Sequence, residues 1–302
     1  MKKFFIFLIV FTVSFGSLYA QNVSDFDIQV NNDGTVTILN YKGSAREITI
    51  PEQIFNMPVT RINNEAFKEK NLTKVTILAK VTVIGDGAFE GNQLTSIILS
   101  EPLERIGARA FIHNRLTSVM LPATLEYIGN GAFMGRNFEN RLSSITIPGK
   151  VLIIGAGAFS DNNLTSVTIP DSVIYIGDEA FKGNRGLTNV VIGNGVEVIG
   201  SYAFNGSNGI TSIRLGSSIR YIGEYAFNGH KLSAIVIPNS VVLIGNNAFS
   251  SDSSSAVTIT IGRNVAIRGN RGGWWDQSLT DTTNLLKAGR YSYSPDEWTL
   301  IQ

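Results

Sequence analysis

The sequence predicts a repeat solenoid, an elongated fold in which short units stack along one axis and share a continuous core. The first observation is a motif, Ile-Gly-x-x-Ala-Phe, that recurs along most of the chain. The second is its period, because successive motif phenylalanines are 22, 22, 22, 26, 22, 23, 23 and 22 residues apart. A fixed period of this length is the signature of stacked repeats. The motif phenylalanines are Phe67, Phe89, Phe111, Phe133, Phe159, Phe181, Phe204, Phe227 and Phe249.

One repeat, residues 164–184, shows why the units must stack. Val167 and Ile169 alternate with polar residues, which predicts a strand with one buried face and one wet face. A proline ends this strand, and Gly177 on the return path permits a tight bend or a close backbone approach. Phe181 then closes the far side in a short helical or 3₁₀ turn. One unit cannot bury these side chains alone, whereas stacked units bury them in continuous columns.

The repeat resembles the BspA type of leucine-rich repeat, whose units read approximately L-x-x-ϕ-x-ϕ-P-x-x-ϕ-x-x-I-G-x-x-A-F, where ϕ is aliphatic. This pattern runs from about Arg46 to about Gly269, and the first of its nine tails has Asn63 in place of glycine. The resemblance implies a long parallel β-sheet on one face and short turns, 3₁₀ or helical segments on the other. It also implies a bacterial or protist surface protein. The chain departs from the family pattern by having no cysteine.

Four segments are expected along the chain. Residues 1–20 form a signal peptide, because two lysines precede an apolar stretch that is short for the alternative, an uncleaved membrane anchor. Residues 21–45 form an N-terminal cap, since residues 26–38 alternate around an Asn-Asp-Gly turn signal and predict a hairpin. Residues 46–269 hold nine to ten repeats. Residues 270–302 form a C-terminal β cap, which an exposed sheet edge requires.

The composition excludes several classes of function. The chain has 302 residues with 25 Lys and Arg and 24 Asp and Glu, so losing the two lysines of the leader changes the formal charge from +1 to −1. A near-neutral chain without a basic run has no electrostatic footprint for nucleic acid. Without cysteine there is no disulfide and no thiolate metal site. No stretch after the leader is apolar enough to span a membrane, so no stable membrane insertion is expected after its removal.

No catalytic residue, cofactor site or metal site is expected. The two histidines of the chain, His113 and His230, are assigned to equivalent turn positions of different repeats. They would lie roughly 24 Å apart, at 4.8 Å per strand, and so could share neither a metal nor a proton. The motifs of serine hydrolases, zinc proteases and phosphate-binding loops do not occur. Acidic residues between the Gly and the Ala-Phe of the motif are interpreted as solvated. They include Asp86, Asp178, Glu179 and Glu224.

The candidate binding surface is the outer face of the predicted strands, where side chains that point away from the core are mostly Ser and Thr. Two clusters interrupt this pattern: Ile98 with Met120, and Val191 with Arg214 and Val236. Adjacent outward aliphatic side chains indicate an interaction surface, and Arg214 offers a planar fork for a carboxylate. The alternative is an ordinary solvated sheet, which Ser and Thr also suit.

Two further features are secondary candidates for recognition. The fourth repeat has about four extra residues within 136–141, around Phe138, which form either a tolerated loop or a local binding feature. The three tryptophans of the chain, Trp274, Trp275 and Trp298, lie in the last segment. That segment resembles the C-terminal end of spirochaete members of the family. Its aromatic residues either cap the last core layer or form a platform for a sugar or peptide.

These features together predict an exported, non-catalytic binding protein of the adhesin kind. The resemblance implies protein ligands, either host extracellular matrix proteins or surface proteins of other bacteria. The expected location is the cell surface or the extracellular space, with the periplasm as the alternative. A second hypothesis is an envelope-associated structural scaffold without a host ligand, and an enzyme is the third.

Overall fold

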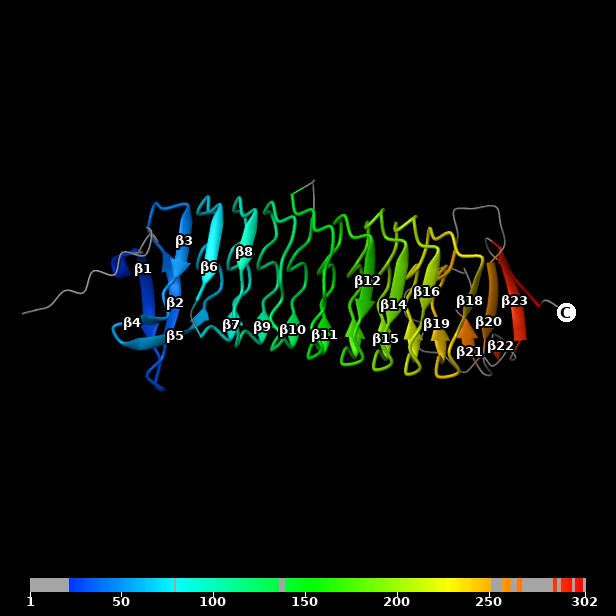
Figure 1. The fold of residues 1–302 in the computed structure, drawn as a ribbon. Coiled ribbons are helices and arrows are strands. Elements are labelled where there is room, and N and C mark those ends of the chain that lie inside the picture. Colours follow the sequence, from blue (N-terminus) through cyan, green and yellow to red (C-terminus); the bar gives the residue numbers. More distant parts are fainter. Residues whose placement is uncertain are drawn as a thin grey trace, which may run out of the picture.

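The chain is a β-solenoid of stacked turns, as the sequence predicts (Figure 1). In the part of the chain that the structure describes, the one helix is a short 3₁₀ turn, η1 (Val23–Asp25). The signal peptide predicted at residues 1–20 lies outside the described residues. The structure, a computed structural model, describes residues 22–78, 80–135, 139–250, 257–261, 265–267, 285–286, 289–294 and 297–300.

Each full turn of the solenoid has a second strand that the sequence reading assigned to turns. These second strands, most of them two residues long, form a parallel ladder within a 14-stranded sheet along the stack. Two residues are too few to show the alternation that identifies a strand. In spatial order the ladder contains β2 (Val36–Tyr41), β5 (Met57–Ile62), β7 (Val83–Ile84), β9 (Arg105–Ile106), β10 (Tyr127–Ile128), β11 (Ile153–Ile154), β13 (Tyr175–Ile176), β15 (Val198–Ile199), β17 (Tyr221–Ile222), β19 (Leu243–Ile244) and β21 (Val265–Ile267).

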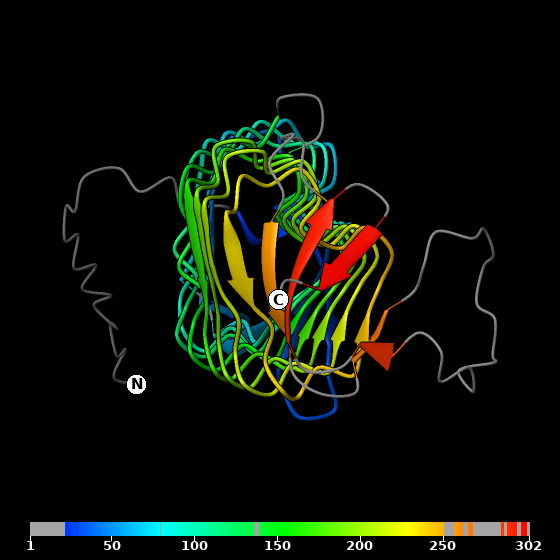
Figure 2. The same ribbon diagram turned by 90° about the vertical axis from the view of Figure 1, so that its right-hand side faces the viewer.

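The longer strands predicted for each repeat form three shorter sheets on another side of the cross-section (Figure 2). Residues 117–121 and 143–148 follow the same path without forming strands, so this side is interrupted. The continuous sheet is therefore the one on the return path. The three sheets hold β3 (Glu47–Ile50), β6 (Lys74–Ile77) and β8 (Ser96–Ile98); β12 (Ser166–Ile169), β14 (Asn189–Ile192) and β16 (Ser212–Arg214); and β18 (Ala234–Val236), β20 (Val257–Ile261), β23 (Gly289–Ser294) and β24 (Glu297–Leu300).

The core between the sheets is organised around a column of phenylalanine rings. All nine motif phenylalanines are at most 1% exposed. Neighbouring rings stack with centroids 4.9–5.5 Å apart and planes 3–15° apart. Tyr41 extends the column at the N-terminal end, because its buried ring stacks on Phe67 at 5.6 Å. The inward position predicted for Phe181 is confirmed.

The motif glycine lies where the backbones of neighbouring turns approach each other. A Cβ atom on Gly177 would lie 2.4 Å from the backbone nitrogen of Ala156, and one on Gly129 would lie 2.4 Å from the carbonyl carbon of Gly107. No side chain larger than hydrogen fits at such distances. Of the two roles expected for Gly177, the structure shows the close backbone approach. The left-handed position of the turn falls two residues later, at Glu179, with φ 58°.

Antiparallel strands close the N-terminal end of the stack. β1 (Phe26–Val30) pairs with β2 through a turn at residues 31–35, which is the hairpin expected from the sequence. β4 (Gln53–Ile54) pairs with β5 in the first repeat. The hairpin supplies the outermost strand of the 14-stranded sheet.

A second set of antiparallel strands closes the C-terminal end. β23 pairs with β20 over five residues, β24 pairs with β23, and β22 (Leu285–Leu286) pairs with β21. These strands occupy sheet edges that would otherwise be open. Trp298 lies in β24, whereas Trp274, Trp275 and Phe138 lie outside the described residues.

Candidate binding surfaces

The larger cluster predicted from the sequence is only partly brought together. β14 and β16 pair so that Val191 lies directly beside Arg214. Arg214 is exposed and Val191 is half-buried. Val236 is 69% exposed, but its strand β18 belongs to the next sheet and pairs with β20. Val236 is thus separated from Arg214 by a break in the hydrogen-bonded sheet between β16 and β18.

The smaller predicted cluster also lies at a break. Ile98 ends β8, the last strand of its sheet, and is 52% exposed. Met120 is 86% exposed in the following turn, where no strand forms. Both side chains are available to a partner, but no ladder holds them side by side.

A longer apolar surface of exposed and half-buried side chains lies on the 14-stranded sheet. In each two-residue strand from β7 to β19 the second residue is an inward isoleucine, so the first points outward. Parallel pairing sets these outward residues directly beside one another. Six consecutive strands have an aromatic or aliphatic residue at this position. We call these residues the outer row: Tyr127, Ile153, Tyr175, Val198, Tyr221 and Leu243.

The centre of the outer row is widened by the residues that precede it. Leu152 and Ile174 are 43% and 47% exposed, beside Ile153 and Tyr175 on adjacent turns. Single exposed aliphatic residues are normal, whereas contiguous ones mark an interaction surface. Val242 extends the exposed surface toward the C-terminal end.

Tyrosine gives the outer row both apolar area and hydrogen-bonding groups. Tyr175 is 38% exposed, and its partial burial raises the pKa of its phenol, with a smaller contribution from Asp178. At the N-terminal end of the row, the guanidinium of Arg105 lies 3.8 Å from the ring centroid of Tyr127. Such rings can pack against apolar side chains while their hydroxyl groups bind polar ones.

A sequence signal for the outer row exists in the residue before each Ile-Gly pair. This position reads Val, Arg, Tyr, Ile, Tyr, Val, Tyr and Leu from residue 83 to residue 243. The alternation with the following isoleucine is only one step long, so it does not identify a strand until the repeats are superimposed. The longer strand of each repeat has the clearer alternation, so the outer row is not predicted from a single repeat.

Two of the four turn carboxylates, Asp86 and Asp178, are exposed as expected and also accept hydrogen bonds from backbone. Asp86 Oδ1 accepts a hydrogen bond from the N–H of Ala108, and Asp178 Oδ1 accepts one from Ser201, both at 2.7 Å. Each acceptor thus joins its turn to the next one. Asp86 and Asp178 are therefore both exposed to solvent and part of the contacts between successive turns.

The two histidines are not at equivalent positions, which corrects the expectation from the sequence. His230 is fully buried, its Nδ1 accepts the N–H of Leu232 at 3.0 Å, and its Nε2 lies 2.9 Å from the carbonyl oxygen of Phe249. His113 lies one position earlier in its turn and pairs with Glu139. Across the described ranges, no three His, Asp or Glu side chains gather as a metal site requires. Those ranges also contain no helix with the length and apolar character needed to cross a membrane.

Three solved structures of bacterial proteins match the chain, and two of them are named as leucine-rich proteins. A T. pallidum leucine-rich repeat protein is 22% identical, with a TM-score of 0.47, over 69% of this chain and 88% of that one. A leucine-rich cell surface protein of Faecalibacterium prausnitzii is 22% identical, with a TM-score of 0.45, over 83% and 90%. The pneumococcal vaccine antigen PcpA is 19% identical, with a TM-score of 0.45, over 80% and 90%. No curated protein matches the chain.

The repeats themselves match a family profile. The profile is described as the BspA type leucine rich repeat region, and it matches residues 60–187 and 137–256 in 6 copies. These ranges cover more than half of the chain and include the stacked phenylalanines and the outer row. The chain therefore belongs to the BspA-type leucine-rich repeat family.

Proposed function

We propose that this protein is an exported, non-catalytic binding protein of the adhesin kind, which uses its repeat surface to bind proteins. The observation that carries the proposal is the outer row, an apolar surface of exposed and half-buried side chains held in register by the solenoid. Proteins with BspA-type repeats are typically found at the cell surface. The expected ligands are host extracellular matrix proteins or surface proteins of other bacteria.

The geometry of the outer row suits a protein partner. Six neighbouring strands span roughly 24 Å at 4.8 Å per strand, enough for several anchoring contacts. Tyrosine is enriched among the residues that dominate interface energies. Charged residues at Glu126, Glu197 and Arg220 lie beside the row and can form a polar rim. Because the backbone is fixed by stacking, a partner would meet a preorganised surface.

The predicted clusters on the other side are a second candidate surface. Val191 and Arg214 are neighbours on paired strands, and the guanidinium of Arg214 can donate hydrogen bonds to a carboxylate of the ligand. They offer less contiguous apolar area than the outer row. A non-catalytic role is supported by Asp86 and Asp178, whose carboxylates are engaged by backbone donors.

The proposal is tested by binding and by location. The purified protein should bind at least one member of a panel of immobilised fibronectin, laminin and collagen, or the surface of other bacterial cells. Protease added outside intact cells should remove it. A folded protein that binds none of these surfaces and is protected from external protease would instead support the envelope scaffold.

A further inference from the structure

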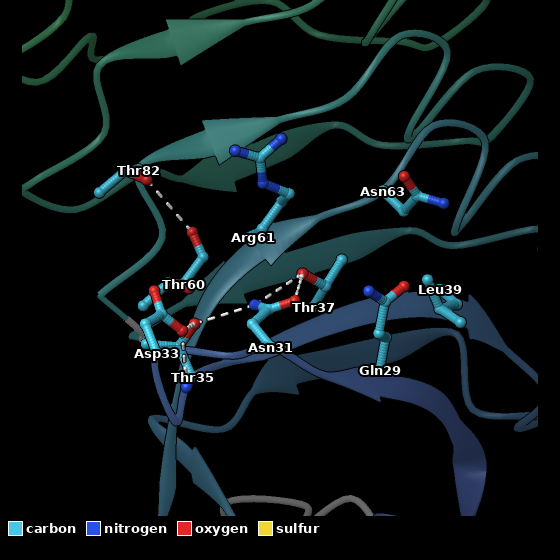
Figure 3. Close-up of a pocket in the computed structure, with 10 residues that line it drawn as sticks. All are labelled: Gln29, Asn31, Asp33, Thr35, Thr37, Leu39, Thr60, Arg61, Asn63 and Thr82. Atoms are coloured by element: carbon cyan, nitrogen blue, oxygen red, sulfur yellow. Dashed lines mark hydrogen bonds between the residues drawn. The ribbon is translucent and has the colours of Figure 1, made fainter.

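A polar groove lies at the N-terminal end of the solenoid, apart from the outer row. It is a hollow of about 570 Å³ where the β1–β2 hairpin meets β5 and the segment that enters β7 (Figure 3). Nine of its ten lining residues are polar, and the tenth is Leu39. This composition differs from the aliphatic and aromatic surface further along the same sheet.

One wall of the polar groove is fixed by its own hydrogen bonds. Asn31 Nδ2 donates to the hydroxyl oxygens of Thr35 at 2.9 Å and Thr37 at 3.1 Å. Asp33 accepts from both the hydroxyl and the N–H of Thr35, at 2.7 and 3.0 Å. Those two bonds, the hydroxyl first, hold the pKa of Asp33 below its usual value. The negative charge of the groove is therefore engaged at the hairpin turn.

The positive charge of the polar groove belongs to Arg61, whose side chain differs from that of Asp33 in its contacts. Figure 3 shows Arg61 projecting from β5 between Thr82 and Asn63. Within the described part of the chain, the side chains of Arg61, Gln29 and Asn63 form no hydrogen bond or ion pair. The groove thus presents one guanidinium and two carboxamides to a ligand.

Arg105 is an arginine outside the groove with which Arg61 can be compared. It occupies the same outward position as Arg61 two strands further along, with Val83 between them. Its guanidinium lies on the ring of Tyr127. Two arginines in one register column therefore differ in whether they have a partner, which makes Arg105 a natural control.

We infer that the polar groove binds a sugar that carries a carboxylate, such as a uronic acid. The guanidinium fork of Arg61 matches a carboxylate in shape and charge. The amide and hydroxyl lining matches sugar hydroxyl groups, while Leu39 alone offers little apolar surface to anchor a peptide side chain. One cation, with Asp33 in the same groove, suits a singly charged carboxylate better than a doubly charged phosphate.

The test uses methyl β-D-glucuronide as the probe and the purified full chain. Backbone amide shifts of Arg61, Asn63 and Thr82 are followed by NMR during a titration with this probe, with methyl β-D-glucoside and with sodium acetate. The glucuronide should give saturable shifts at these residues. The other two compounds should bind about ten-fold more weakly or worse, because each lacks one half of the recognised chemistry.

Matched variants of Arg61 and Arg105 test whether the guanidinium of Arg61 binds the carboxylate of the sugar. Arg61→Gln should weaken glucuronide binding about ten-fold or more, while Arg105→Gln should leave it unchanged. Glucoside binding as tightly as glucuronide, equal losses in both variants, or no saturable shift in the folded chain would each overturn the inference. None of these results depends on whether a protein ligand binds the outer row.

Discussion

The carboxamide of Asn162 donates a hydrogen bond of 2.9 Å to the carbonyl oxygen of Phe133, in the preceding turn of the solenoid. Its Oδ1 atom accepts the N–H of Leu142 at 2.8 Å. One buried side chain therefore satisfies backbone groups that have no partner in a sheet. The same two bonds to the preceding turn recur at Asn92, Asn114, Asn140 and Asn184.

Replacing Asn162 with alanine should destabilise the protein by about 3 kcal/mol or more. The N–H of Leu142 and the carbonyl of Phe133 would both lose a buried partner, at about 1–3 kcal/mol each. Urea denaturation measures the change in the free energy of unfolding. Asn163→Ala is the control, since Asn163 is exposed and its loss should cost no more than about 0.5 kcal/mol. Equal losses in the two variants would disprove the structural role of the Asn162 side chain.

Replacing Phe181 with alanine should cost about 3–5 kcal/mol, as for other large-to-small changes in a core. The rings of Phe159 and Phe204 stack on Phe181 at 5.4 and 5.2 Å, so their turns should also lose protection in hydrogen exchange. A loss below about 1 kcal/mol in chemical denaturation would contradict the role of the column.

Alanine at Gly177 should destabilise the protein by about 1–3 kcal/mol or more, because its Cβ atom would meet the backbone of Ala156. The matched control is Gly149→Ala, since no atom lies within 4 Å of a Cβ atom built there. Thermal melting of both variants makes the comparison. A Gly177 variant as stable as the Gly149 variant would show that neighbouring turns are not in close contact.

Removing the chain from Arg271 onward should cause the last turns to fray or the protein to aggregate. The truncation deletes β22, β23 and β24, so β20 regains an open edge beside the buried Ile259. Size-exclusion chromatography and thermal melting report both effects. A soluble monomer with unchanged melting would mean that this segment does not cap the stack, which would leave Trp274, Trp275 and Trp298 available for recognition.

The period of the motif was enough to predict the solenoid and its core. The phenylalanine equivalent to Phe181 recurs in all nine motif copies and the glycine equivalent to Gly177 in eight of them, so all copies support one interpretation. The hairpin at residues 26–41 could be predicted because its alternation and its turn are local. Position in the repeat also predicted which strand residues face outward, as at Ile98 and Arg214.

Features that depend on neighbouring turns could not be read from one unit. Tyr175 belongs to a two-residue strand, which exists because parallel neighbours pair with it and not because of its own sequence. His230 lies three residues after its motif phenylalanine, Phe227, whereas His113 lies two residues after Phe111, and this offset becomes visible only when the repeats are superimposed. The polar groove joins residues between Gln29 and Thr82 that share no periodic pattern.

The measurement that tests the central claim most directly is the affinity of a bound matrix protein for two surface variants. One variant carries Ile153→Ser, Tyr175→Ser and Tyr221→Ser in the outer row, and the other carries substitutions on the other side of the solenoid. Neither variant alters an inward residue, so both should fold, as circular dichroism can show.

The second variant carries Val191→Ser, Arg214→Ser and Val236→Ser on the other side of the solenoid. Surface plasmon resonance should show a loss of at least about thirty-fold for the outer-row variant, the effect of removing about 2 kcal/mol of anchoring contacts. The second variant should stay within about three-fold of the unmodified protein. Unchanged affinity in the outer-row variant, with the loss in the second variant instead, would contradict the account and place binding on the opposite strands.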